Sequence, residues 1–173
     1  MTIQNSYAYP MVRGSGAFLV CVGAGIVAAT LWPTAAPVHI SIFLASVGLG
    51  AIAIPLVRRI RPLGAPPRRH IAVMLAALLL EFIAFYLVFS KLPPATPLTD
   101  KWLWAFLIVG VHFLPMGWAL GKRVVFLGLA CIAFALVGLL SPGIPFEFVS
   151  VMDGILKLAF GAHLALTGIP RHP

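Results

Sequence analysis

The sequence predicts an all-α membrane protein, a bundle of six transmembrane helices forming one domain over residues 1–173. Two observations lead to this fold class. Of the 173 residues, 61% are hydrophobic and only 9% are charged, whereas a soluble domain carries about 25% charged residues. The apolar residues also gather in long runs, and the mean hydropathy is +1.06. A water-soluble fold and a disordered chain are therefore both excluded.

Six apolar runs come close to the roughly 20 residues that a helix needs to cross a bilayer. They lie at residues 14–32, 38–57, 71–90, 102–120, 124–141 and 148–168. Proline, which removes a backbone donor and disfavours helix in the residue before it, marks most of the breaks. These prolines are Pro33, Pro62, Pro66, Pro67, Pro93, Pro94, Pro97, Pro142 and Pro145.

The first run has features of a signal peptide, and the fourth and fifth runs are joined by a very short connection. The first begins after Arg13 and precedes Thr34-Ala35-Ala36, which resembles a signal-peptide cleavage site. Because Pro37 is a poor residue after such a cut, we expect a permanent helix. The fourth and fifth runs are separated only by Gly121-Lys122-Arg123 and should form a tight antiparallel hairpin.

The basic residues predict the orientation of the bundle. With the N-terminus inside, nine of the twelve lie on the inner side, and only Lys91 and Lys101 lie on the outer side. The nine are Arg13, Arg58, Arg59, Arg61, Arg68, Arg69, Lys122, Arg123 and Arg171. This bias predicts that both termini lie in the cytoplasm. It also accounts for the net charge of +8 without a nucleic-acid partner.

Four ionisable residues fall inside the predicted spans. Glu81, His112 and Lys157 each lie about ten residues into a span, and Asp153 precedes Lys157 by one helical turn. An ionisable side chain at the bilayer centre costs about 2.5–3.5 kcal/mol on insertion scales, so each of them needs a reason. By contrast, Asp100 and Glu147 are expected in the first turns of their helices, where a carboxylate is favourable.

Two interpretations of the four residues remain open. In the first, an Asp153–Lys157 pair and a Glu81–His112 hydrogen bond set the register of the helices. In the second, the four residues are catalytic and carry protons beside a cavity. Glu81 or Asp153 then donates a proton, His112 orients the acid or accepts the final proton, and Lys157 tunes Asp153.

Aromatic residues on the same spans are candidates for binding an apolar substrate or for stabilising a cation with their ring faces. The alternative is that they pack in the core or face lipid. The predicted substrate-binding residues are Phe82, Phe85, Tyr86, Trp104, Phe113 and Phe160, and Phe89 and Phe106 lie on the same spans.

The cysteines and the absence of known motifs argue against a metal or cofactor site. Cys21 and Cys131 lie in apolar runs and are expected to pack as small apolar side chains. No nucleotide, metalloprotease or metal–diphosphate motif is present, so we expect neither cofactor nor metal.

Gly117 and Gly121 form a GxxxG step, which is compatible with a homodimer.

The sequence resembles two groups of proteins. His112-Phe113-Leu114-Pro115, Gly121-Lys122, and Asp153-Gly154-Ile155-Leu156-Lys157 with Phe160-Gly161 resemble a family of small uncharacterised bacterial six-span proteins. The resemblance covers the last three spans best and the third span more loosely, through Glu81. It implies a bacterial cytoplasmic membrane and supplies no activity. In chemistry type, the intramembrane acids are also similar to those of integral-membrane terpene cyclases. That similarity implies that Glu81 and Asp153 are the acids that start cyclisation.

We therefore expect an intramembrane enzyme, a cyclase or isomerase without metal or nucleotide, that applies acid/base chemistry to an apolar isoprenoid-type substrate. The most concrete form of this hypothesis is a proton-initiated terpene cyclase, for which Glu81→Gln should abolish turnover. The main alternative is a small proton-coupled transporter or channel. An accessory subunit is the third.

Overall fold

The computed structural model describes residues 9–32, 36–60, 63–141 and 143–167. These residues form six helices: α1 (Val12–Leu31), α2 (Ala36–Ile60), α3 (Arg68–Phe89), α4 (Leu98–Leu120), α5 (Lys122–Leu140) and α6 (Phe146–Leu166). Each is long and apolar enough to cross a membrane. The prediction of an all-helical fold with six helices of membrane-spanning length and hydropathy is confirmed for the described residues. Pro33, Thr34, Ala35, Arg61, Pro62, Pro142 and Arg171, on which parts of the sequence prediction rest, lie outside them.

The helices begin two to four residues before the predicted spans. In every helix except α2 the added residues include charged side chains, which continue the helix past the apolar run. Pro67, Pro97 and Pro145 each stand immediately before a helix, where a proline's missing N–H costs nothing. Asp100 and Glu147 lie in the first turns of α4 and α6, as predicted. Their negative charge there interacts favourably with the helix dipole.

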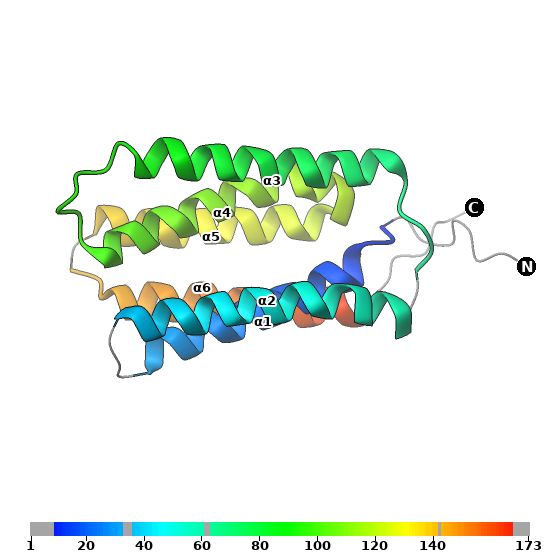
Figure 1. The fold of residues 1–173 in the computed structure, drawn as a ribbon, viewed down its shortest axis with the longest axis horizontal. Coiled ribbons are helices and arrows are strands. Elements are labelled where there is room, and N and C mark those ends of the chain that lie inside the picture. The colour runs from blue at the N-terminus through cyan, green and yellow to red at the C-terminus, as the bar shows by residue number, and fades with distance from the viewer. Residues whose placement is uncertain (1–8, 33–35, 61–62, 142, 168–173) are drawn as a thin grey trace, which may run out of the picture.

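The six helices run alternately up and down and form two groups (Figure 1). In one group α1 packs against α2 and α6, and in the other α4 packs against α3 and α5. The two groups meet mainly where α5 packs against α6, and no extensive packing joins α2 to α3. The bundle is thus divided between α2 and α3.

Glycines allow the closest helix pair, α1 and α6, to approach. A methyl group on Gly16 would lie 2.7 Å from the carbonyl oxygen of Gly161, and one on Gly161 would lie 2.8 Å from that of Gly16. Gly23 and Gly154, one heptad along each helix, have the same reciprocal relationship. The matched spacing runs in opposite directions along the two helices, which are therefore antiparallel. Small residues are typical of helix interfaces in membranes because they bring the backbones together.

The α4–α5 hairpin forms as predicted and turns at Gly121. This residue has φ +99°, a conformation that glycine adopts without strain. A methyl group on Gly117 would meet the side chain of Val125 in α5. The GxxxG step is therefore used within the chain, and the homodimer stays a prediction.

The outer surfaces of α2 and α3 are apolar and exposed. Leu49 and Ile52 on α2 are 62% and 66% exposed, and Leu79 and Phe82 on α3 are 61% and 69% exposed. Contiguous apolar surface of this kind is unusual on a soluble monomer. Contact with lipid accounts for it.

Charge is segregated between the ends of the bundle. The end that holds the start of α1, the α2–α3 connection and the α4–α5 turn carries Arg13, Arg58, Arg59, Arg68, Arg69, Lys122 and Arg123. The opposite end, with the α3–α4 connection, carries Lys91 and Lys101. The described residues therefore have one strongly basic end, where α1 begins and α6 ends (Figure 1).

Candidate functional site

An ion pair lies inside the bundle on α6. The ammonium of Lys157 donates a hydrogen bond to Oδ2 of Asp153, one helical turn earlier. The two side chains are 2% and 1% exposed. Glycine-mediated contact between α1 and α6 brings α1 close to this helix and helps to exclude solvent. A pair so deeply placed is stabilising only if both charges remain balanced.

The ammonium of Lys157 has two further neighbours. It lies 3.7 Å from Sγ of Cys131 on α5, to which it donates a weak hydrogen bond. It also lies 5.5 Å from the centre of the Phe106 ring on α4, within the range of a cation–π contact. Cys131 is fully buried in the apolar core, as expected of a packing residue. Its contact with Lys157 was not predicted, since nothing in the sequence places α5 beside this face of α6.

One oxygen of the Asp153 carboxylate is unsatisfied. Oδ1 is buried and has no hydrogen-bond partner among the described residues. A buried carboxylate oxygen without a donor is costly, so this atom is a natural place for a proton or a ligand group. The Asp153–Lys157 pair is therefore only partly satisfied by the protein.

A second polar pair joins α3 to α4. Nδ1 of His112 lies 3.4 Å from Oε2 of Glu81 and 3.1 Å from the backbone oxygen of Ala77. With hydrogen on Nδ1, the ring donates to the Ala77 carbonyl. The His112 side chain is 6% exposed and that of Glu81 is 16% exposed. Because α3 packs mainly on α4, this pair fastens the outermost helix of its group.

The four predicted residues thus form two pairs, the same two that the register interpretation predicts. Among the described residues, no hydrogen bond or ion pair links Glu81 or His112 with Asp153 or Lys157. Their similar depth in the bilayer follows from their positions along the helices.

A cavity of about 320 Å³ opens where α2 and α3 are not packed together. Its wall is almost entirely apolar, and its two ionisable residues are Lys101, in the first turn of α4, and Lys157. Its aromatic residues come from three helices: Phe43, Phe85, Phe89, Trp102 and Phe106. The volume is within the roughly 300–1,000 Å³ of small-molecule sites. A ligand here would have to be mainly hydrocarbon.

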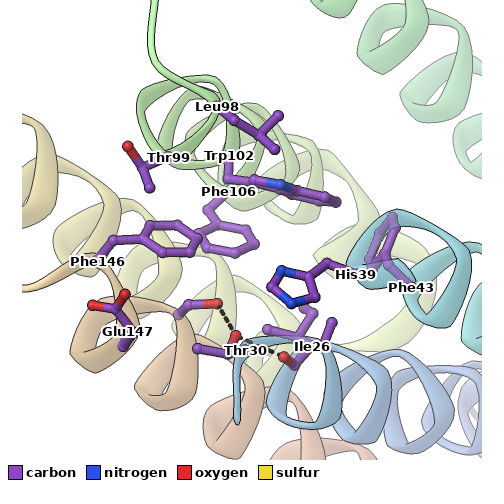
Figure 2. Close-up of a pocket in the computed structure, with 12 residues that line it drawn as sticks. Ile26, Thr30, His39, Phe43, Leu98, Thr99, Trp102, Phe106, Phe146 and Glu147 are labelled. Carbon is purple, nitrogen blue, oxygen red and sulfur yellow. Dashed lines mark hydrogen bonds between the residues drawn. The ribbon is translucent and has the colours of Figure 1, made fainter. Parts of the chain in front are cut away.

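A second cavity of about 170 Å³ adjoins the first and shares Ile26, Phe43, Leu98, Trp102 and Phe106 with it. Figure 2 shows the Trp102, Phe106 and Phe146 rings on one side and His39 with Phe43 on the other. Polar groups also line it: Thr30, His39, Thr99, Glu147 and Ser150. The first cavity is apolar and the second is more polar, and the two lie side by side near the less basic end of the bundle.

The predicted substrate-binding residues are dispersed. Phe85 lines the apolar cavity. Phe82 and Tyr86 are 69% and 73% exposed on the outer surface of α3, whereas Phe113 is buried in the core and Phe160 packs against it. The fourth-span residue Trp104 is half-buried and lines neither cavity.

The predicted substrate-binding residues do not include most of the aromatic residues that line the apolar cavity. Neither Trp102 of α4 nor Phe43 of α2 is among the substrate-binding residues that the sequence predicts. The two rings contact each other edge to face, with centres 5.1 Å apart. Trp102 lies shortly after Pro97 and Phe43 shortly after His39 in the sequence, and neither spacing predicts this contact. The contact depends on where α2 lies relative to α4.

Comparison with known proteins gives one family. Residues 2–172 match the family described as a family of unknown function (DUF6609), and the chain belongs to that family. No curated protein and no solved structure matches the chain. Membership in this family assigns no activity to the chain.

Proposed function

We propose that this member of a family of unknown function is an intramembrane enzyme that binds an apolar isoprenoid-type molecule and acts on it by acid/base chemistry. The observation that carries the proposal is the position of Lys157, which pairs with Asp153 on one side and lines the apolar cavity on the other. In its most concrete form, the reaction is a proton-initiated cyclisation.

The apolar cavity supports an isoprenoid-type ligand. Hydrocarbon is favoured there because the wall exposes no polar atom, and Lys101 and Lys157 contribute only carbon atoms to it. Because α2 and α3 are not packed together, an apolar molecule could enter between them from the bilayer without crossing water. The adjoining polar cavity suits a substrate with one polar end.

The Asp153–Lys157 pair supports acid/base chemistry. A proton held by the pair is delivered to an epoxide oxygen or a double bond, and a cation develops on the substrate. The faces of Trp102 and Phe106 stabilise that cation. Loss of a proton from a neighbouring carbon returns the pair to its starting state, so that the product is an isomer of the substrate.

The structure changes which acid we favour. The cavity is lined by Lys157 and not by Glu81 or His112. We therefore assign proton donation to Asp153 with Lys157, and give Glu81 and His112 the positioning of α3.

The experiment uses purified protein in D2O with linear, epoxidised and indole-linked prenyl compounds. Wild type is expected to give a deuterium-labelled isomer by mass spectrometry. Asp153→Asn removes the proton donor, and Ala105→Phe fills the cavity that Ala105 lines. Both should abolish the product, whereas Ala76→Phe, on the exposed surface of α3, should not. A wild-type protein that labels none of these compounds would rule out this reaction for them.

A proton-coupled transporter is the second candidate, favoured by the separate Glu81–His112 pair. This pair joins α3 to α4 away from the cavity lining, and the enzyme proposal gives it no chemical task. Intramembrane carboxylate–histidine pairs can relay protons in transporters. Proton flux in sealed liposomes that is lost in Glu81→Gln would favour this function.

We also propose that the basic end of the bundle faces the cytoplasm of a bacterial cell and that the chain lies in its cytoplasmic membrane. Arg58, Arg59, Arg68 and Arg69 flank one connection at that end. Cytoplasmic connections carry such an excess of basic residues.

A further inference from the structure

The second cavity exposes polar atoms on its wall, whereas the wall of the apolar cavity beside it exposes none. The two cavities share lining residues, among them Trp102 and Phe106. One molecule can therefore place a hydrocarbon chain in the apolar cavity and a polar head in the second. The hydrogen-bonding groups around the second cavity decide which kind of head fits it.

His39 of α2 contributes a hydrogen-bond acceptor to the second cavity. Its Nε2 lies 3.0 Å from the backbone oxygen of Trp32. Because a carbonyl oxygen only accepts, Nε2 carries the hydrogen, and Nδ1 of the neutral ring is then an acceptor. Nδ1 has no hydrogen bond among the described residues. Figure 2 shows one nitrogen of this ring directed toward the Trp102 and Phe106 rings across the cavity.

The hydroxyl groups of Thr30 and Ser150 have no hydrogen left to donate. The Thr30 hydroxyl donates to the backbone oxygen of Ile26 at 2.8 Å. In its 2.6 Å contact with Ser150, the Ser150 hydroxyl is therefore the donor. Both bonds are drawn as dashed lines in Figure 2. Only oxygen lone pairs remain there for a ligand.

The acidic residue of this lining is Glu147, in the first turn of α6. It is exposed, and its carboxylate has no ion pair or hydrogen bond among the described residues. The side chains that can still donate are the Thr99 hydroxyl and the Trp102 indole. Acceptors on four residues thus exceed donors on two, so the cavity fits a ligand head that donates hydrogen bonds.

Aromatic rings flank the same space and favour a positive charge on that head. The Phe106 and Phe146 rings stack with centres 6.4 Å apart, and the Trp102 and Phe106 centres are 6.2 Å apart. Ring faces attract cations. Among the described residues, no lysine or arginine lines the second cavity, and the lysines of the apolar cavity contribute only carbon atoms to its wall. No ammonium of the protein therefore occupies this position.

The helix ends beside the cavity do not reverse this preference. The first turns of α4 and α6 border it, and a helix N-terminus carries about half a positive elementary charge, which attracts anions. Asp100 in α4 and Glu147 in α6 lie in those turns. The full negative charge of each carboxylate more than offsets the partial charge of its helix end.

We propose that the two cavities together bind a primary alkylammonium ion, with its single hydrocarbon chain in the apolar cavity and its ammonium group in the second cavity. An ammonium group has three hydrogens to donate. Nδ1 of His39 and the Glu147 carboxylate accept them, and the faces of Trp102 and Phe146 stabilise the charge. The apolar wall holds the chain by burying hydrocarbon.

This inference goes beyond the proposed function, because it requires binding and no reaction. Failure of the isomerisation experiment does not affect the binding of an amine. Failure of amine binding does not affect Asp153-dependent isomerisation of uncharged substrates. The two experiments therefore fail independently.

The test measures binding of radiolabelled dodecylamine at pH 7 to the purified full chain in phosphatidylcholine nanodiscs, with binding to empty nanodiscs subtracted. Saturable binding of one amine per chain is expected. Dodecanol and dodecanoate have the same chain, and each should compete about tenfold or more weakly than unlabelled dodecylamine, since hydrogen bonds to a charged group contribute the difference. Dodecyltrimethylammonium, which keeps the charge but has no N–H group, should fall between them and dodecylamine.

Two substitutions separate the site from the general charge of this end of the bundle. Glu147→Gln removes the charge at nearly constant size and should weaken binding by about tenfold or more. Asp100→Asn is the matched control, because Asp100 also lies in a first helical turn but lines neither cavity. It should bind dodecylamine as wild type does.

Three further substitutions test the two cavities without changing any charge. Ala29→Phe fills the second cavity and Ala105→Phe fills the apolar cavity, and both should weaken binding, whereas Ala76→Phe on the exposed surface of α3 should not. Absence of saturable binding, or equal losses in Glu147→Gln and Asp100→Asn, would overturn the proposal. Dodecanoate competing as well as dodecylamine would also overturn it and would assign the second cavity to an anion.

Discussion

Gly23 of α1 and Gly154 of α6 lie against each other's backbones: a methyl group on Gly23 would be 2.6 Å from the carbonyl oxygen of Gly154, and one on Gly154 would be 3.0 Å from that of Gly23. Asp153 is the neighbour of Gly154 in sequence, and Lys157 follows one turn later. The contact between α1 and α6, the most extensive in the bundle, therefore covers the helix that carries the buried ion pair. Thr30 and Ser150 extend this contact with a hydrogen bond of 2.6 Å.

We predict that Gly154→Ala destabilises the protein by about 1–3 kcal/mol, because the added methyl would force α1 and α6 apart. Thermal unfolding in detergent measures the effect. Gly48→Ala on α2 is the matched control, since a methyl there meets nothing within 4 Å. It should leave stability unchanged or raise it by up to about 1 kcal/mol through helix propensity. Equal effects at the two positions would contradict the glycine contact.

We predict that Lys157→Met destabilises the protein by about 3–5 kcal/mol, because the charge of Asp153 would remain buried without its partner. Replacing both residues, with Asp153→Leu and Lys157→Met, should recover most of that loss, since a buried ion pair can be exchanged for apolar side chains at little cost. Unfolding in detergent compares the two variants with wild type. A double variant no more stable than the single one would show that the pair contributes through something other than charge balance.

We predict that His112→Ala loosens α3 from α4. The variant removes the hydrogen bond to the Ala77 carbonyl and the contact with Glu81. Because the Glu81 carboxyl then loses its partner, we expect the free energy of unfolding to fall by about 1–3 kcal/mol. Hydrogen exchange of the α3 amides should rise, whereas exchange in α1 and α6 should not. Uniform acceleration in all helices would mean that His112 supports the whole bundle instead.

We predict that the two carboxyl variants separate in the labelling reaction. Asp153→Asn should lose at least 99% of the deuterium-labelled isomer, and Glu81→Gln should retain most of it, because the apolar cavity is lined by Lys157, the partner of Asp153, and not by Glu81. Both proteins are first compared by size-exclusion chromatography so that misfolding is not mistaken for inactivity. The reverse result would move the acid to Glu81.

We predict that the basic end is cytoplasmic. In a Cys21→Ala background, Ala95→Cys lies in the exposed α3–α4 connection and Ala65→Cys in the exposed α2–α3 connection. A membrane-impermeant maleimide added to intact cells should label Ala95→Cys and reach Ala65→Cys only after the cells are opened. Labelling of Ala65→Cys in intact cells would invert the orientation.

The sequence by itself determined the six helices, their membrane character and the segregation of charge. These follow from local properties: runs of apolar residues long enough for a bilayer, prolines at their ends and arginines in the connections. The depth of Glu81, His112, Asp153 and Lys157 was also available, because depth depends only on position along a helix.

Only the tertiary structure decided which of these residues meet. Apolar side chains surround each helix, since lipid and protein core are equally apolar, and hydrophobicity therefore does not mark the packed face. The steric fit of Gly16, Gly23, Gly154 and Gly161 selects it instead, and no single helix contains that information. Through that fit the ion pair on α6 is enclosed. The missing contact between α2 and α3 then leaves the apolar cavity that Lys157 borders.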